Sequence, residues 1–156
     1  MEDTRAASVL EESLIHLGLQ CEDREEVLQF LGQSLLEKGY VKPGFIKALL
    51  EREREFPTGI PTGHIGVAIP HTDASYVNQT RMAVGILNHP VLFEEMGSDE
   101  GTVPVEIVLV LAISDSNLHL TFLQKLMSLF QKHDTLSQIK KAQTPQKVIT
   151  LLQSIF

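Results

Sequence analysis

The segment that most restricts the possible folds of this chain is residues 105–113, VEIVLVLAI, which is almost continuously apolar and rich in Val and Ile. Residues of these types favour strands, and a strand that is apolar on both sides is typical of a sheet covered on both faces. Residues 65–69 (IGVAI) and 81–87 (RMAVGIL) also predict strands, and residues 14–19 (LIHLGL) predict a short one. We therefore expect a small sheet with residues 105–113 at its centre.

Helical segments flank these strands. Asp23 and Glu26 have the spacing of an N-cap residue and its reciprocal partner, and they predict a helix over about 24–38. Pro43 suits the first turn of a second helix, which must end before Pro57. Three further helices are expected after the sheet, at about 118–132, 135–142 and 145–155.

This order of elements predicts an α/β fold in which helices sandwich a small mixed β-sheet. A chain of 156 residues suits one compact domain, so we expect residues 1–156 to form a single domain, with residues 1–8 loosely held.

Composition excludes several classes of function. The net charge of −7, without a cluster of Lys and Arg, argues against binding to nucleic acid. No apolar run approaches the roughly 18 residues of a membrane span, and Met1-Glu2-Asp3-Thr4-Arg5 lacks the layout of a signal peptide. The single Cys21 cannot form an internal disulfide. We therefore expect a cytoplasmic protein that does not itself insert into the membrane.

Two histidines follow predicted strands. The run VAI ends in Pro70 and His71 follows at once, while His119 lies just after residues 105–113, at the start of the next helix. If the two strands are parallel neighbours, both imidazoles face one crevice, and the helix start adds free backbone N–H groups there. Arg52 could add a positive charge. Such a set suits a transient phosphoryl group, with one imidazole attacking phosphorus and the other donors holding its oxygens.

Other interpretations of these residues stay open at this point. A Pro-His turn can be merely structural, a histidine near an apolar helix face is usually a packing residue, and Arg52 lies in a charged run that is typical of a solvated helix face. His64, His71 and His119 could supply three zinc ligands, although the chain has no metal-type spacing. Zinc apart, four histidines look structural or exposed: His16, His64, His89 and His133. We expect no metal and no cofactor.

The motif GVAIPHT, residues 66–72, resembles the active-site signature of the enzyme IIA domains of the phosphoenolpyruvate-dependent sugar phosphotransferase system, in the mannitol/fructose superfamily. Residues 36–53 (LEKGYVKPGFIKALLERE) are similar to the helices that lead to the Arg-Glu pair of that family. Residues 103–126 are similar to its buried strand, loop and second histidine. The resemblance extends from about residue 8 to the end of the chain.

The resemblance implies the mannitol/fructose-type enzyme IIA fold and a phosphotransferase activity. His71 would accept a phosphoryl group on Nε2 from the histidine of HPr and pass it to a cysteine of a separate enzyme IIB. His119 would stabilise the phosphoryl group or orient the ring, and Arg52 would help to neutralise the phosphate charge. The protein would act in sugar transport by associating with a separate membrane permease complex.

The chain departs from the mannitol and fructose pattern between Arg52 and the signature, where residues 54–65 form a longer segment. Its PTGI motif, residues 57–60, resembles the galactitol-type branch, which implies a galactitol-like sugar alcohol. The alternative is a regulatory enzyme IIA paralogue that signals by its phosphorylation state. A third hypothesis is a domain that binds a metal or ligand without being phosphorylated.

Overall fold

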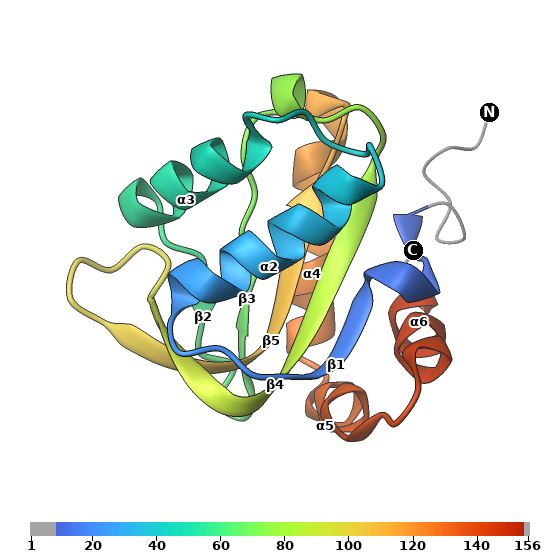
Figure 1. Cartoon of the computed structure of the whole chain (residues 1–156). Coiled ribbons are helices and arrows are strands. Elements are labelled where there is room, and N and C mark those ends of the chain that lie inside the picture. The colour runs from blue at the N-terminus through green and yellow to red at the C-terminus, as the bar shows by residue number, and fades with distance from the viewer. Residues whose placement is uncertain (1–8, 155–156) are drawn as a thin grey trace.

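Strand β5, Thr102–Ala112, lies at the centre of a five-stranded sheet in the computed structural model (Figure 1), with the strand order β1-β4-β5-β3-β2. Its neighbours are β4 (Arg81–Glu94), which is antiparallel to it, and β3 (Gly66–Ala68), which is parallel. On the outside, β1 (Ile15–Leu19) runs parallel to β4, and β2 (Gly59–Ile60) runs antiparallel to β3. The predicted mixed sheet and its central strand are confirmed.

Helices cover both faces of this sheet, and β5 explains why. Its residues Ile107, Leu109 and Leu111 belong to one apolar cluster, and Val108 and Val110 belong to the other. Figure 1 shows α2 and α3 in front of the sheet and α4 behind it. The helices are α2 (Arg24–Glu37), α3 (Phe45–Glu55), α4 (His119–Phe130), α5 (His133–Lys141) and α6 (Pro145–Gln153). Short 3₁₀ turns lie at Glu12–Leu14 (η1), Ala74–Tyr76 (η2) and Ser116–Leu118 (η3).

The ends of the first two helices differ in detail from the expectation. The Asp23 side chain caps α2 by accepting from the Glu26 N–H at 2.9 Å, as predicted, but the Glu26 carboxylate accepts from the N–H of Glu22 and not from that of Asp23. Pro43 is not in the first turn of α3. The chain first makes a turn in which the Phe45 N–H donates to the Lys42 carbonyl, and the helix begins after it.

Strand β4 is twice as long as its apolar pattern suggests. Residues 88–90 are exposed, so the alternation stops there, yet the strand resumes and pairs Val91 with Val105 after an irregularity in register. Backbone pairing with β5 therefore extends the strand beyond its core-facing part.

The long segment 54–65 comprises the end of α3, strand β2 and the turn that leads to β3. Gly59 pairs with Ala68 and Ile60 with Val67, so the turn lies at the end of the hairpin away from His71. After that turn β3 comes very close to β5: a Cβ on Gly66 would lie 2.3 Å from the Pro104 carbonyl oxygen. Only glycine permits this approach.

The structure describes residues 9–154, so the expected loose segment 1–8 lies outside it. Within the described residues, every helix is too short or too polar to cross a lipid bilayer.

Candidate functional site

His71 lies where β3 leaves the sheet, and the backbone on both sides of it is fixed. After β3, the Pro70 carbonyl accepts a hydrogen bond from the Leu111 N–H at 2.9 Å, so His71 remains bridged to the central strand. Pro70 restricts its own φ angle to near −65°, which further limits the chain at this point. The ring of His71 is thus held at the end of a strand and remains partly accessible.

One hydrogen bond sets the chemical state of this ring. Nδ1 of His71 lies 2.8 Å from the carbonyl oxygen of Ile69. A carbonyl oxygen can only accept, so Nδ1 carries the proton. In the neutral imidazole Nε2 then carries the lone pair, which makes it the nucleophilic nitrogen.

His119 is the first residue of α4 and lies opposite His71, as the parallel pairing of β3 and β5 requires. The two ring centroids are 5.7 Å apart, and the ring planes are inclined at 56°. Nε2 of His119 is buried and has no hydrogen-bond partner within residues 9–154. The expected pairing of the two histidines is present, with an imidazole nitrogen available for a bound group.

The start of α4 does not offer the free N–H groups that we expected. The Asn117 N–H donates to the Asp115 side chain at 2.9 Å, the Leu118 N–H to the Asp115 carbonyl, and the His119 N–H to the Ser116 carbonyl. A 3₁₀ turn precedes the helix and uses these donors, so that prediction is wrong for residues 117–119.

Arg52 is on the last turn of α3, and its guanidinium carbon lies 4.8 Å from the centroid of the Phe56 ring. Arg52 and His71 both line a cavity of about 440 Å³, whose other walls include Met96 and Leu123. The positive charge of Arg52 acts on both histidines. The structure thus brings Arg52, His71 and His119 close together. Arg52 is partly buried, so it does not belong to a fully solvated face of the helix.

Both histidines have a lowered pKa. Burial is the main cause for His71, and the charges of Arg52 and His119 lower its pKa further, against an opposing contribution from the Ile69 carbonyl. Burial and Arg52 lower the pKa of His119, while Asp73 opposes them. The neutral form of each ring is therefore favoured near neutral pH, which keeps the lone pair of His71 available.

Glu53 is the residue of this region that the sequence interpretation missed. It is 1% exposed, and its carboxylate accepts hydrogen bonds from the Thr58 N–H at 2.8 Å and the Thr58 hydroxyl at 2.9 Å. Burial raises its pKa to about 7. The sequence spacing could have predicted this burial. Glu53 follows Phe45 and Leu49 at intervals of four residues, which places it on the same, buried side of α3.

The other histidines do not join the site. Nε2 of His64 lies 2.6 Å from the hydroxyl of Ser137, and the His64 ring stacks near that of His133 at 5.5 Å. His64, His71 and His119 therefore do not form a ligand set, and within residues 9–154 no three His, Cys, Asp or Glu side chains are placed to hold a metal ion. His16 packs edge-on against Phe30.

Cys21 lies next to the start of α2. Burial raises the pKa of its thiol, and the carboxylates of Glu26 and Asp23 raise it further. The thiol is therefore protonated near neutral pH, which fits an unreactive side chain.

Nearly the whole chain matches a known family. A sequence profile described as "Phosphoenolpyruvate-dependent sugar phosphotransferase system, EIIA 2" matches residues 8–155. The galactitol-specific EIIA component of Escherichia coli K12 is 32% identical over 120 residues, which are 77% of this chain and 79% of that protein. The mannitol-specific EIICBA component of Pasteurella multocida is 28% identical over 98% of this chain and 24% of its own length.

Solved structures show the same fold. The enzyme IIA for mannitol from Escherichia coli, solved in complex with phosphorylated enzyme IIB for mannitol, superposes with a TM-score of 0.77 at 22% identity, covering 93% of this chain and 97% of that one. The crystal structure of the same mannitol IIA protein gives a TM-score of 0.73 at 23% identity, with coverage of 92% and 98%.

Proposed function

Because this chain belongs to the EIIA 2 family of the phosphoenolpyruvate-dependent sugar phosphotransferase system, and is thus a phosphotransferase component, we propose that His71 is its phosphoryl acceptor. The observation that carries this proposal is the hydrogen bond from Nδ1 of His71 to the Ile69 carbonyl, which leaves Nε2 as the nucleophile. His71 also lines the cavity that Arg52 shares.

The transfer consists of two displacements at phosphorus. Nε2 of His71 attacks the phosphorus of a phosphohistidine donor, a new N–P bond forms, and the donor's N–P bond breaks with its electron pair returning to the donor imidazole. In the second step a thiolate of the acceptor attacks the same phosphorus. An S–P bond then forms, and His71 recovers its lone pair on Nε2.

His119 and Arg52 act on the charge of the phosphoryl group. In this proposal the partnerless Nε2 of His119 carries the proton of the neutral ring and donates it in a hydrogen bond to a phosphoryl oxygen, and the guanidinium of Arg52 neutralises part of the negative charge. Donors that are fixed before the reaction stabilise charge in the transition state without having to reorganise.

The donor in this account is phospho-HPr and the acceptor is an enzyme IIB. A mannitol IIA protein of the same fold has been solved together with its phosphorylated IIB partner, and a multiphosphoryl transfer protein of Escherichia coli O157:H7 is 27% identical over 88% of this chain. These relatives support a phosphoryl relay that ends on an enzyme IIB, and we propose that it operates in the cytoplasm towards a separate membrane permease.

The transported substrate is a galactitol-like sugar alcohol. The support is the 32% identity to the galactitol-specific component, which agrees with the resemblance of residues 57–60 to that branch. A regulatory paralogue would use the same chemistry at His71, but these relatives favour transport.

The test is a phosphorylation assay with phosphoenolpyruvate, enzyme I and HPr, read by intact mass and peptide mapping at mildly alkaline pH. One acid-labile phosphoryl group on the peptide that contains His71 is expected. His71→Ala should accept none while keeping its fold, because the residue ends a strand and does not fill the core. Full acceptance by that variant would refute the assignment.

A further inference from the structure

Thr58 and Gly59 connect three walls of the His71 cavity. From α3, Glu53 accepts the Thr58 N–H and hydroxyl. From β3, the Ile69 N–H donates to the Thr58 carbonyl at 3.4 Å, and from the β4–β5 hairpin the Met96 N–H donates to the Gly59 carbonyl at 2.8 Å. Residues 58–59 are therefore hydrogen-bonded to the helix that carries Arg52, to the strand that precedes His71 and to the loop that contains Met96.

Ile69 is the link to the reacting ring. Its N–H is bound to Thr58, and its carbonyl accepts the Nδ1 proton of His71. If Thr58 shifted, Ile69 would rotate or move with it. The Ile69 carbonyl would then hold the His71 ring less firmly. Glu53 is thus connected to His71 through Thr58 and Ile69. Three successive contacts make this connection, and each of them is hydrogen-bonded.

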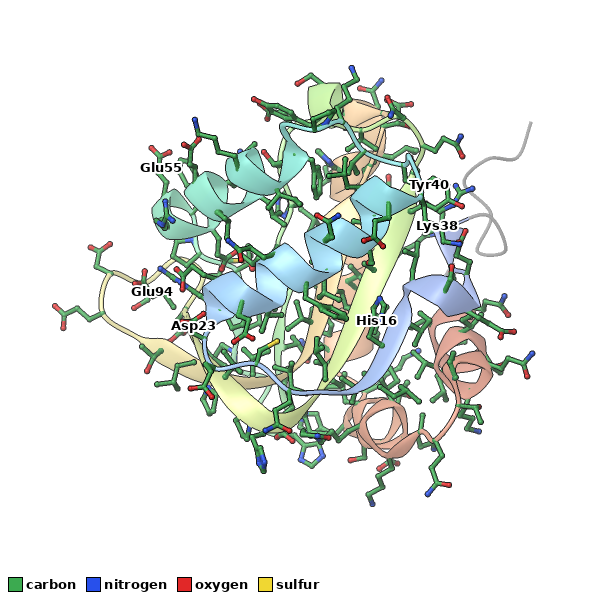
Figure 2. The ribbon with its side chains drawn as sticks, in the orientation of Figure 1. His16, Asp23, Lys38, Tyr40, Glu55 and Glu94 are labelled. Atoms are coloured by element: carbon green, nitrogen blue, oxygen red, sulfur yellow. The ribbon has the colours of Figure 1, made fainter. Side chains whose placement is uncertain are left out.

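The surroundings of Glu53 favour a fixed position. Both of its carboxylate oxygens are used, one for the Thr58 N–H and one for the hydroxyl. Arg24 supplies a nearby positive charge and also lies 3.7 Å from a carboxylate oxygen of Glu94. Figure 2 shows Glu94 on the hairpin beside the N-terminal end of α2, and the backbone carbonyl of Glu94 lies close to Gly59.

We propose that Glu53 is a positioning residue for phosphoryl transfer: it fixes Thr58, and through Thr58 and Ile69 it keeps the Nδ1 proton of His71 in place and Nε2 directed into the cavity. This inference rests on the proposed function of His71. Glu53 does not touch the reacting atoms, and it acts through the backbone that holds them.

Two substitutions of Glu53 test this role. Glu53→Leu removes both acceptors, so phosphate acceptance from phospho-HPr should fall by about 10- to 100-fold, the usual scale for a misplaced reacting group. In Glu53→Gln the side-chain oxygen can still accept the Thr58 N–H and the amide can donate to the Thr58 hydroxyl. This variant should keep most of the wild-type rate. Glu51→Leu, an exposed change on the same helix, is the matched control.

The second readout is the tautomer of His71, measured from the ring nitrogen shifts by ¹⁵N NMR on unphosphorylated protein. Glu53→Leu should lose the single Nδ1–H form, while Glu53→Gln should retain it. An unchanged tautomer and rate in Glu53→Leu would overturn the proposal, as would a Gln variant as impaired as the Leu variant. Because the tautomer needs no phosphoryl donor, failure of the wild type to accept phosphate would overturn only the proposed function.

Thr58→Val covers the case in which Glu53→Leu does not fold. It removes the hydroxyl and leaves the backbone N–H, so it should lower the rate less and loosen the same tautomer. A wild-type rate together with an unchanged tautomer in Thr58→Val would contradict the link between Glu53 and Thr58.

Discussion

At the scale of single residues, the site depends on how neighbours set the state of each imidazole. The Ile69 carbonyl determines which nitrogen of His71 carries the proton, and burial together with Arg52 keeps both rings neutral. The positions of His71, His119 and Arg52 could be predicted from sequence because each ends or begins an element. The bond to Ile69 could not, because it depends on the rotation of one side chain.

His119→Ala should still accept phosphate, because the nucleophile on His71 is intact. Onward transfer to enzyme IIB should slow by about 100-fold, because the phosphoryl oxygens lose one donor in the transition state. Forward and reverse rates measured by rapid quench check this, with exposed His89→Ala as the matched control. Wild-type rates in both directions would make His119 a structural residue.

The pH dependence of acceptance follows from the lowered pKa of His71. Because the pKa of His71 lies below the usual 6.5, the neutral ring predominates at pH 7, and the rate should fall on acidification with a midpoint below pH 6.5. Arg52→Gln removes a cation, which should raise the pKa of both histidines. A ¹H NMR titration of the ring protons, with Arg54→Gln as control, measures this. A midpoint above 6.5 in the wild type, or no rise in Arg52→Gln, would contradict the account.

At the scale of elements, the chain's apolar pattern and its capping residues were sufficient for most of the fold. The continuous apolar run of β5 predicted its central place, and Asp23 marked the start of α2. What depended on pairing between distant segments could not be predicted in this way. Strand β2 has two residues, and the second half of β4 exists because β5 pairs with it.

Gly66→Ala tests the close packing of β3 on β5. A Cβ there would lie 2.3 Å from the Pro104 carbonyl oxygen, so the strands must separate. The free energy of unfolding should fall by about 1–3 kcal/mol or more, as in other overpacked sites. Urea denaturation measures it, and Gly44→Ala is the control, since its new Cβ would meet only the movable Tyr76 ring at 3.1 Å. Equal, small losses in both variants would show that β3 can shift freely.

At the scale of the whole molecule, Glu53 affects both the stability of the fold and the proposed function. The same buried carboxylate that holds Thr58 has a pKa raised to about 7 from 4.5. The folded state therefore binds this proton more tightly than the unfolded state does. The stabilising contribution is complete below pH 4.5 and is lost as the pH rises through 7.

Glu53→Gln removes this titration. The free energy of unfolding of the wild type, relative to the variant, should therefore increase as the pH is lowered from 8 to 4.5, by at most about 3 kcal/mol. Urea unfolding of both proteins at four pH values across this range provides the comparison. A difference that does not change with pH would mean that Glu53 titrates normally and is not held as the structure shows.

The most direct test of the central claim is to identify which nitrogen of His71 carries the phosphoryl group. Protein labelled with ¹⁵N in histidine is phosphorylated by phospho-HPr, and long-range ¹H–¹⁵N correlation spectra are recorded at alkaline pH. Because the Ile69 carbonyl holds the proton on Nδ1, the account predicts phosphorylation at Nε2 of His71 alone. A phosphoryl group on Nδ1, or on any other histidine, would contradict it.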